Sequence, residues 1–393
     1  MKILMLTHRF PWPPNRGTTI RSYHLLKYLA SQHEVLLLSF VDTMEGLPER
    51  LRHLQKFCKK IETVLLNDTI AKIKAAQALL NGKPLSVEAF YSKKFENSFK
   101  EIIQVLKPDL VVTDSSALAF YPFQHAQPFI ADFMDVDSEK WNQFSTFSRW
   151  PLNWIYRMES KQLAEFERKV ASQSEAILVV SENERRQLQK LAPQTSVCVI
   201  PNGVDPSYFY PSNTSLVPGR IVFTGVMDYF PNIEGVCWFC REIGPKVKEE
   251  VPEASFFIVG INPSSKVRAL RHLSGVYVTG TVPDVRLFLG EAQVCVAPLR
   301  FAIGLQNKVL EALAMGKAVV ATPGAVQGLA SEPQAVIKVA NTAGEFAENV
   351  VEFLKREDIR QKYEKTGPFF IKKYHDWNRN LKEIENLYQV KRP

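Results

Sequence analysis

The chain has 393 residues, of which 46% are hydrophobic and 23% charged, and its formal net charge is +8. This length favours two domains of roughly 150–200 residues, and the composition is typical of a soluble globular protein. No apolar run approaches the roughly 18–20 residues that cross a bilayer. Zinc-finger spacing and RNP-like aromatic runs are both missing, so we expect no nucleic-acid partner.

The N-terminal stretch MKILMLTHRF is followed by PWPPNRG rather than by small residues and a cleavage site, so we interpret it as a strand, not a signal peptide. The chain has five cysteines, a small, odd and scattered set that favours a reducing cytoplasm. Cys237 and Cys240 form a C-x-x-C inside the apolar helical pattern IEGVCWFCREI. We expect core packing for this pair rather than metal or redox chemistry.

In the first half, short apolar runs bounded by polar or turn residues predict buried strands. These runs are KILMLTH (2–8), EVLLLSFV (34–41), IETVLL (61–66), DLVVTD (109–114), PFIADF (128–133), AILVVS (176–181) and SVCVI (196–200). Amphipathic patterns over 20–32 and 154–172 predict helices between them.

The second half repeats this alternation after a linker over 199–220 that is rich in Pro, Asn, Gly and Ser. Its predicted strands are RIVFTG (220–225), SFFIVG (255–260), GVYVTG (275–280), QVCVAP (293–298), AVVATP (318–323) and AVIKVA (335–340). Continuous apolar strands alternating with helices indicate parallel sheets covered on both faces. We therefore predict an α/β protein with two doubly wound, Rossmann-like domains, residues 1–200 and residues from 201 onwards.

Open parallel sheets bind ligands beyond the carboxyl ends of their strands. The loops at these ends are RFPWPPNRG (9–17), MDVDSEKW (134–141), GVMDYFPN (225–232) and RFAIGLQN (300–307). We expect them to line a cleft between the two domains. Neither G-x-G-x-x-G nor a Walker A motif occurs, which argues against a conventional dinucleotide or P-loop site.

The stretch NKVLEALAMGKAVVATP begins an apolar helix near Asn307 and continues into a strand. Gly304 allows the backbone to approach a ligand, and the free N–H groups of the helix start favour an anion. Lys308 adds a positive charge that suits a diphosphate. Glu311, one turn later, lies on the same side and can accept hydrogen bonds from a vicinal diol such as a ribose. An ordinary surface ion pair between these two residues is the alternative.

PNGVD (201–205), GVMDYFPN and the block GLQNKVLEALAMGKAVVATP together resemble retaining GT-B glycosyltransferases of family four. The resemblance covers nearly the whole chain, and it is strongest to bacterial exopolysaccharide sugar transferases associated with PEP-CTERM/exosortase systems. It implies a C-terminal helix, about 376–393, that crosses back from the second domain (201–375) onto the first. It also implies transfer of a sugar from a nucleotide-sugar donor to a saccharide or lipid-linked acceptor, with no other cofactor and no metal.

Carried over by position, the resemblance assigns donor-site roles to several residues. Glu311 would hold the ribose hydroxyls and Lys308 the diphosphate, and both belong to the predicted catalytic set. The other predicted donor-binding residues are Gly17, Gly225, Val282, Arg300, Gly304, Gln306 and Asn307. Gly225 would close over the phosphates, Val282 would meet the base through its backbone, and Gly17 would lie near the transferred sugar.

Three positions depart from the family pattern. The first glutamate of the family's E-x7-E is Ile303 here. The Arg and Lys that commonly follow the glycine of the Gly225 loop are absent, so we expect Arg300 and Lys308 to balance the diphosphate. Met134 and Asp135 stand where many members have a histidine.

On the acceptor side, a carboxylate can take the acceptor proton or stabilise an oxocarbenium-like state. We predict Asp135 for this role. Asp137 would orient it or cap the helix that starts at SEKW, and the pair is not expected to bind a metal. His8, His24 and His125 rank behind these carboxylates, with His24 more consistent with a structural role. Arg9 and Arg16 lie in the same N-terminal loop and have the reach to contact a phosphate; solvated charge is the alternative.

Residues 51–100 contain ten Lys or Arg against four Asp or Glu. This surplus predicts salt-sensitive peripheral contact with an anionic membrane, at the inner face of the cytoplasmic membrane. Two other classes of function remain open: a GT-B nucleotide-sugar 2-epimerase and a non-catalytic nucleotide-sugar-binding scaffold.

Overall fold

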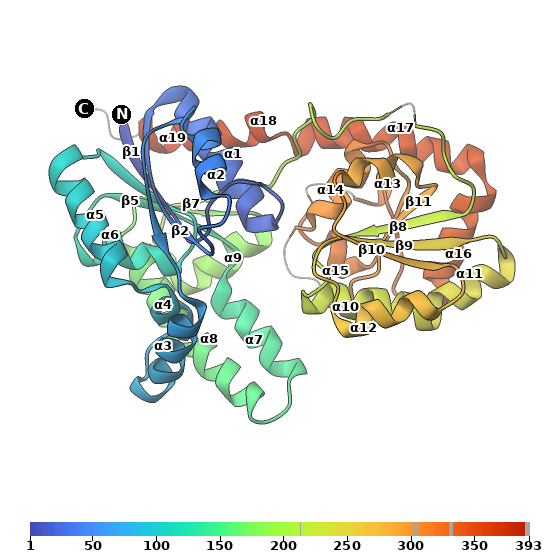
Figure 1. Ribbon diagram of the computed structural model, residues 1–393, viewed down its shortest axis with the longest axis horizontal. Coiled ribbons are helices and arrows are strands. Elements are labelled where there is room, and N and C mark those ends of the chain that lie inside the picture. Colours follow the sequence, from blue (N-terminus) through green and yellow to red (C-terminus); the bar gives the residue numbers. More distant parts are fainter. Residues whose placement is uncertain (213, 302–304, 330–332, 390–393) are drawn as a thin grey trace. The chain divides into compact units, whose positions relative to one another are not determined.

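The computed structural model describes the whole chain except residues 213, 302–304, 330–332 and 390–393. The chain divides into two compact units, Met1–Ile200 with Leu381–Pro393, and Pro201–Asn380. Each unit contains one parallel sheet with helices between successive strands (Figure 1). The predicted α/β class with two doubly wound, Rossmann-like halves is therefore confirmed.

The described residues of the first unit form a seven-stranded sheet in the order β3-β2-β1-β4-β5-β6-β7, with parallel pairing throughout. The strands are β1 (Lys2–Thr7), β2 (Glu34–Val41), β3 (Cys58–Leu65), β4 (Leu110–Thr113), β5 (Phe129–Met134), β6 (Ala176–Val179) and β7 (Val197–Val199). Each predicted apolar run of the first half overlaps one of these strands, although β3 begins three residues before its run and β5 ends one residue after its run.

The helices of the first unit are α1 (Gly17–Gln32), α2 (Leu47–Leu54), α3 (Asp68–Asn81), α4 (Leu85–Phe90), α5 (Lys93–Leu106), α6 (Phe120–Gln124), α7 (Asp137–Phe147), α8 (Leu152–Gln173), α9 (Glu182–Leu191) and α19 (Glu383–Gln389). Side chains cap several of their N-termini, as when Ser92 accepts from the Phe95 amide of α5 and Ser181 from the Glu184 amide of α9.

Both faces of this sheet are buried, which explains why its strands are continuously apolar. Leu4 and Leu6 of β1 pack in a core with Phe95 and Phe99 of α5. Ile3 and Met5 point to the opposite face by strand alternation and are fully buried as well.

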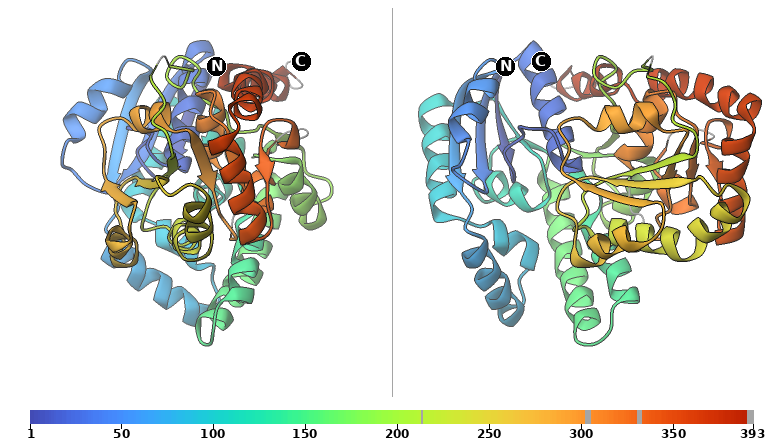
Figure 2. Two further views of the ribbon diagram at one scale, coloured as in Figure 1. Left: turned by 90° about the vertical axis from the view of Figure 1, so that its right-hand side faces the viewer. Right: turned by 45° about the vertical axis from the view of Figure 1, so that its right-hand side comes forward.

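The second unit's described residues form a six-stranded sheet in the order β10-β9-β8-β11-β12-β13, again with parallel pairing. The strands are β8 (Arg220–Thr224), β9 (Ser255–Val259), β10 (Val276–Gly280), β11 (Val294–Ala297), β12 (Val319–Ala321) and β13 (Lys338–Val339). Figure 2 shows the helices on either side of this sheet.

The helices of this unit are α10 (Phe230–Trp238), α11 (Gly244–Glu250), α12 (Ser265–Ala269), α13 (Val285–Glu291), α14 (Asn307–Ala314), α15 (Pro323–Val326), α16 (Ala343–Lys355), α17 (Glu357–Tyr374) and α18 (Trp377–Leu381). A π-helical segment, Phe239–Ile243, joins α10 to α11. It contains Cys240, which is buried in the core as predicted, whereas Cys237 in α10 is half-buried.

Each sheet reverses its strand order once, between β1 and β4 in the first unit and between β8 and β11 in the second. The loops that leave the carboxyl ends of these strands diverge, which creates the crevice where doubly wound sheets bind ligands. Three of the loops singled out in the sequence, those after β1, β8 and β11, are at these two reversal points.

The PNGVD motif pairs with the C-terminal segment of its own unit. Val204 forms a parallel bridge with Asp376, and the His375 ring nitrogen Nδ1 lies 2.9 Å from the Asn202 carbonyl. A Cβ on Gly203 would lie 2.7 Å from the backbone nitrogen of Trp377. The motif therefore contains glycine because two backbones approach each other here.

The predicted C-terminal helix is two short helices, α18 and α19. In the first unit, Tyr28 of α1 donates a hydrogen bond to the Glu385 carboxylate of α19. Burial and this carboxylate both raise the pKa of Tyr28. Within the described residues, no helix has both the length and the apolar character needed to cross a bilayer.

A buried ion pair fixes α1 against β5. Arg21 donates from Nε to Asp132 Oδ2 over 2.6 Å and from a second nitrogen to Oδ1 over 2.9 Å. Arg21 also donates to the carbonyl of Ile200 over 2.7 Å. Both side chains are almost fully buried, so each charge depends on the other for its solvation.

Removing one partner of this pair should destabilise the first unit. Asp132→Ala leaves the guanidinium of Arg21 buried and uncompensated, and we expect the free energy of unfolding to fall by about 3–5 kcal/mol. Hydrogen exchange of the β5 amides at increasing urea measures this unit alone. Asp42→Ala is the control, because that carboxylate is 57% exposed and its pair with Arg50 is at the surface. Equal effects of the two substitutions would contradict the proposed importance of the pair.

Candidate active site

Helix α14 starts directly beyond the carboxyl end of β11, at the strand-order reversal of the second unit. Gln306 is its N-cap residue, and the backbone carbonyl of Gln306 accepts from the Val309 amide over 2.9 Å. Val309, Leu310, Ala312 and Leu313 are buried in the core. The apolar pattern of this helix thus serves packing, and Lys308 and Glu311 share the half-buried side. Ile303 and Gly304 lie outside the described residues, so the roles expected for these positions stay predictions.

The ammonium of Lys308 has a neutral partner. Its Nζ donates to Oδ1 of Asn232 over 2.9 Å and lies 5.0 Å from the centre of the Phe223 ring. No ion pair joins Lys308 to Glu311 in the described part of the chain, so the alternative of an ordinary surface ion pair does not apply. Burial lowers the pKa of Lys308 to about 8, against the opposing charge of Glu311. Burial raises the pKa of Glu311 to about 7, against the opposing charge of Lys308.

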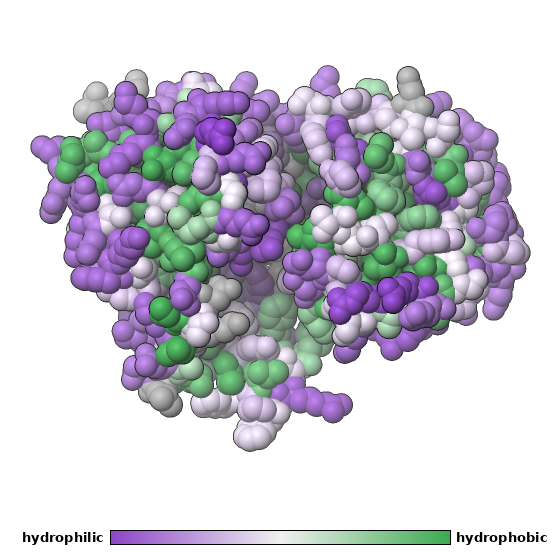
Figure 3. Space-filling model, viewed as in Figure 1, coloured by the Kyte–Doolittle hydropathy of each residue, from purple (hydrophilic) through white to green (hydrophobic). Residues whose placement is uncertain are grey.

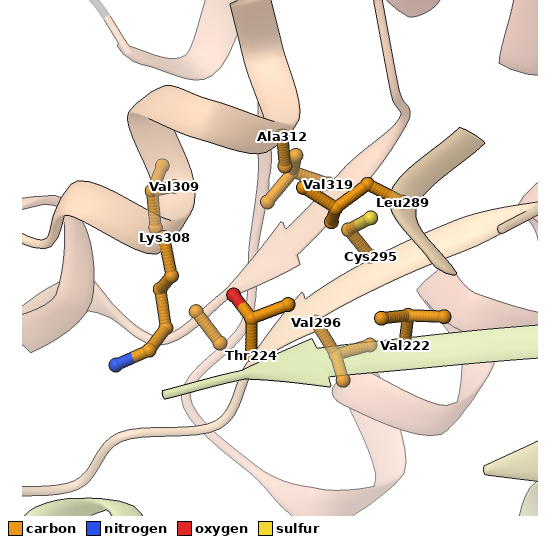
Figure 4. A pocket seen from close by; sticks show the side chains of 10 residues that line it. Val222, Thr224, Leu289, Cys295, Val296, Lys308, Val309, Ala312 and Val319 are labelled. Carbon is orange, nitrogen blue, oxygen red and sulfur yellow. The ribbon is translucent and has the colours of Figure 1, made fainter. Parts of the chain in front are cut away.

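The aliphatic stem of Lys308 lines a small cavity, and its ammonium points away from it (Figure 4). The other lining residues are Val222, Thr224, Leu289, Cys295, Val296, Ala297, Val309, Ala312 and Val319. The cavity has a volume of about 10 Å³, room for at most one water molecule. It is a packing defect beneath the site, and any ligand must lie on the ammonium side.

Gly225 and Asn232 position Lys308. Asn232 is buried, and its Nδ2 donates to the Val226 carbonyl over 2.8 Å, so this amide links the loop after β8 to Lys308. A Cβ on Gly225 would lie 2.8 Å from Asn232 Nδ2 and 3.4 Å from Lys308 Cε. The residue predicted to close over the phosphates therefore lies directly against the lysine predicted to bind them.

Glycines also occupy the ends of the next two strands. Gly260, after β9, has a φ of +151°, and a Cβ there would lie 1.7 Å from the carbonyl oxygen of Gly225. Its amide donates to the Gly280 carbonyl at the end of β10 over 3.2 Å. Val282 follows in the loop before α13 and packs partly buried against the core, which leaves its side chain committed to packing. At the carboxyl edge near Lys308, the adjacent strands β8, β9 and β10 therefore each end in or directly before a glycine, which leaves backbone atoms exposed to a ligand there.

Arg300, the second cation expected at the diphosphate, is already paired. It donates from Nε and a second nitrogen to Oε1 of Glu234 in α10, and its guanidinium lies 5.1 Å from the centre of the Trp238 ring. Sequence reasoning missed Glu234 and Asn232, two residues apart in the loop-helix segment after Gly225. The charge of Arg300 is balanced within the protein, whereas that of Lys308 faces an amide.

In the first unit, Asp135 follows β5 at the carboxyl edge of the sheet. Met134, immediately before it, has a φ of +62°, and the pairing of β5 with β6 shifts register at this point. Positive φ in a residue with a side chain costs energy and concentrates at functional sites. This conformation turns the chain so that Asp135 precedes the start of α7.

Asp137 does not cap α7, contrary to one of the two roles predicted for it. Val136 is the N-cap residue, and Asp137 is the first residue of the helix. Burial raises the pKa of Asp137 above its usual value. The charge of Asp135 raises it further, and Lys140 and His8 oppose the increase. Its carboxylate accepts from the Ser116 hydroxyl over 3.4 Å.

Two buried glutamates cap the start of α7 instead. Glu167 of α8 accepts from the Ser138 amide over 3.2 Å and from its hydroxyl, and Glu184 of α9 accepts from the Val136 amide over 2.7 Å. Burial raises the pKa of Glu167 to about 8 and that of Glu184 to about 7, with further increases from the neighbouring aspartates. The sequence contained a signal for Glu167, because it lies on the apolar stripe of α8 with Leu163 and Val170.

His8 has an orienting carboxylate. It directly follows β1, and its Nδ1 lies 2.8 Å from Oδ1 of Asp114, which directly follows β4 across the strand-order reversal. Ser22 of α1 donates to the other oxygen of Asp114 over 2.8 Å. A histidine oriented in this way by a buried carboxylate has the arrangement of a general base. The residue ranked behind Asp135 thus lies at the same edge of the same sheet.

The other sequence candidates are distributed differently. Gly17 is the exposed first residue of α1, after the β1 loop that also contains Arg9 and Arg16. His24 lies inside α1 against the Tyr23 ring. His125 precedes β5, so it lies at the amino edge of the sheet, where its Nε2 is 3.4 Å from Glu96. The structure therefore separates His125 from the candidate site.

Within the described residues, no group of three or more His, Cys, Asp or Glu side chains could hold a metal ion. Asp135 and Asp137 lie on opposite sides of the helix boundary at Val136. The extended geometry in which both would face one ion is therefore not present.

Two family models match the chain. Residues 16–208 match Glycosyltransferase Family 4, and residues 218–356 match Glycosyl transferases group 1. An uncharacterized glycosyltransferase of Methanocaldococcus jannaschii, MJ1069, is 19% identical over 180 residues, 43% of this chain and 45% of that protein. The match thus spans less than half the length of this curated relative.

Solved structures of similar fold cover the whole chain. Sucrose-phosphate synthase from Thermosynechococcus elongatus has a TM-score of 0.72 at 16% identity, over 99% of both chains. Anabaena Alr3699/HepE, solved in complex with UDP-glucose, has a TM-score of 0.66 at 12% identity, over 99% of this chain and 100% of that one. Both family models are glycosyltransferase models and together they match most of the chain, and the similar solved structures show that its fold is GT-B.

Proposed function

We propose that the protein moves a sugar from a nucleotide-sugar donor to a saccharide or lipid-linked acceptor, with retention at the anomeric carbon. The product would serve bacterial exopolysaccharide or other cell-surface glycan synthesis. The observation that supports this most is the Lys308 ammonium, which faces a neutral amide beside three strand ends made of glycine. An anionic ligand with a large backbone-contacting surface fits such a site better than any cationic or apolar ligand.

The donor reaction breaks the bond between the anomeric carbon and the diphosphate oxygen, so negative charge develops on the leaving group. The charge of Lys308 and the positive end of the α14 dipole are oriented before the reaction begins, which is how electrostatic preorganisation lowers a barrier. Glu311, one turn further, has no hydrogen-bond or ion-pair partner among the described residues. It is available to accept from the two hydroxyls of a ribose.

Uridine diphosphate is the first nucleotide to test, because Alr3699/HepE was solved with UDP-glucose and with UDP. We propose that no metal takes part. Lys308 and the helix start supply positive charge at the diphosphate, so charge balance does not require a cation there.

On the acceptor side, Asp135 is proposed to take the proton of the attacking hydroxyl or to stabilise the positive charge at the anomeric carbon. Because the configuration is retained, the new bond between the acceptor oxygen and the anomeric carbon forms on the face from which the diphosphate leaves. His8, oriented by Asp114, is the second group at this edge with the chemistry of a base. A 2-epimerase or a binding scaffold would need neither group to act on an acceptor, so transfer of radiolabelled sugar that depends on the acceptor separates the three functions.

We place the reaction in the cytoplasm, at the inner face of the cytoplasmic membrane. All five cysteines are free in the structure, which suits a reducing compartment. A lipid-linked acceptor would bring the substrate to this membrane face.

Donor affinity should depend on pH through both Lys308 and Glu311. Lys308 loses its charge as pH rises through about 8, and Glu311 gains a proton as pH falls through about 7. Affinity for UDP-glucose, whose diphosphate does not titrate in this range, should therefore peak between pH 7 and 8 and decline on both sides. Calorimetry from pH 5.5 to 9.5 measures this.

Two substitutions separate the limbs of that profile. Glu311→Ala should weaken binding at neutral pH and abolish the decline on the acid side, while the protein stays folded. Lys308→Arg should keep binding above pH 8, because an arginine does not titrate there. Unchanged affinity in Glu311→Ala would show that this carboxylate does not bind the donor.

Gly225→Ala should also weaken donor binding, because its Cβ would displace the Asn232 amide and with it the anchor of Lys308. We expect a loss of about tenfold, the equivalent of one charge-assisted hydrogen bond. Gly244→Ala is the matched control, since a Cβ there meets its nearest neighbour at 3.4 Å. The assignment fails if the two variants bind UDP-glucose equally well.

Asp135→Asn should reduce turnover far more than donor affinity, because the substitution keeps the shape of the side chain and removes its charge and basicity. Transfer by the wild-type protein should survive EDTA. If chelation stops transfer and Mg²⁺ or Mn²⁺ restores it, a metal site replaces this role of Asp135. His8→Ala measured in parallel, with the pH dependence of turnover, shows which of the two groups is the base.

A further inference from the structure

Helices α7 and α8 form a hairpin that projects away from the sheet of the first unit (Figures 1 and 2). Its far end, residues 141–158, reads WNQFSTFSRWPLNWIYRM. This stretch contains three of the chain's six tryptophans, two arginines and no acidic residue. Such a composition is unusual for a solvent-exposed hairpin, where charged residues of both signs are expected.

The hairpin has an aromatic core of its own. The ring of Trp141 lies 5.2 Å from that of Tyr156 and 5.9 Å from that of Phe144, so these three residues hold α7 against α8. Glu159, buried lower in α8, accepts from the amides of Leu85 and Ser86 and ties the hairpin to α4. The hairpin therefore has packing and hydrogen bonds of its own away from Trp150, Leu152 and Trp154.

Those end side chains are large, apolar and exposed. Trp150 is 82% exposed, Phe147 65%, Trp154 55% and Leu152 48%. The exposed guanidinium groups of Arg149 and Arg157 lie among them, and neither forms an ion pair with any described residue. We name these six residues the hairpin tip.

A second apolar element lies at the same end of the unit. Ile70 and Ile73 of α3 are 50% and 54% exposed. Both views place α3 beside the hairpin, at the end farthest from the N-terminus (Figures 1 and 2). Figure 3 shows hydrophobic and weakly polar side chains gathered over this end. Helix α3 and the hairpin tip can therefore contact the same flat surface.

We propose that the hairpin tip docks on the surface of an anionic phospholipid bilayer, with Trp150 and Trp154 in the headgroup region. Tryptophan is the residue most suited to that region, since its ring is apolar and its N–H polar. Arg149 and Arg157 add attraction to anionic lipid, and no acidic side chain in the stretch opposes it. A second copy of this chain is a poorer partner. It would bring its own two arginines against Arg149 and Arg157 if the two tips met.

This surface differs from the basic stretch that sequence composition suggested. Within residues 51–100, lysines 60, 83, 93 and 100 form ion pairs with glutamates 62, 88 and 96 of the same stretch. These four charges are largely balanced before any lipid approaches, although the stretch as a whole keeps its positive surplus. Membrane docking by the tip deepens the proposed location at the membrane. It can hold even if the protein does not transfer a sugar.

The test uses the full chain and sedimentation with sucrose-loaded vesicles of phosphatidylcholine, with or without phosphatidylglycerol. Wild-type protein should bind the mixed vesicles and bind less to phosphatidylcholine alone. Trp150→Glu combined with Trp154→Glu should reduce partitioning at least tenfold. Arg149→Glu combined with Arg157→Glu should reduce it at least fivefold at low salt, with little difference in 0.5 M salt.

Phe369→Glu is the control, because this aromatic residue is 75% exposed on α17 of the second unit and should leave partitioning unchanged. Affinity for UDP-glucose, measured on each variant, separates this proposal from the donor site: tip variants should bind the nucleotide as wild type does. Equal partitioning of the tip variants and the wild type overturns the proposal. So does a tip variant that converts a dimer into a monomer in sedimentation velocity while vesicle binding persists.

Discussion

The half-buried ammonium of Lys308 is the interaction on which the donor side of the second unit depends. Removing a charge from water is costly unless an opposite charge or several dipoles replace the water. Among the described residues, the structure supplies one amide oxygen, that of Asn232, and the face of the Phe223 ring, while the neighbouring carboxylate of Glu311 acts only through space. Gly225 leaves the room for this contact. The site is thus incompletely solvated until an anion arrives, and binding a diphosphate would offset that deficit.

The first unit gathers carboxyl groups at the corresponding edge of its sheet. Glu167 and Glu184 are buried against the start of α7, where helix amides replace water, and burial still raises the pKa of both. Asp135 and Asp137 add negative charge beside them. In the reaction that we propose, the second unit would offer a cation to the leaving diphosphate, and the first would offer carboxyl groups for a proton or a developing positive charge. The two sheets share a topology, but Lys308 follows a strand at the reversal of the second sheet, whereas Asp135 follows β5, one strand beyond the reversal of the first.

The strands were predictable because parallel strands buried on both faces are apolar throughout, and α14 was predictable from its apolar face. The residues that complete the site were not. Asn232 contacts Lys308, and Glu234 contacts Arg300, from a helix more than 60 residues earlier in the chain. A periodic sequence pattern predicts elements but not contacts between residues so far apart. His8 and Asp114 are brought together only by the β1–β4 pairing. Glu167 could have been found, since a charged residue within a buried stripe needs a buried partner.

Helix α7 connects the two proposals for the first unit. It begins next to Asp135 and ends at Phe147, in the hairpin tip. Its 11 residues rise about 1.5 Å each, so the helix spans roughly 16 Å. If the tip rests in the headgroup region, α7 would act as a rigid spacer that sets how far Asp135 is held from the membrane surface. For the lipid-linked acceptor that we propose, this spacing would decide whether the acceptor hydroxyl reaches the carboxylate. The aromatic packing of Trp141 against Tyr156 supplies that rigidity, which explains why the hairpin has a core of its own.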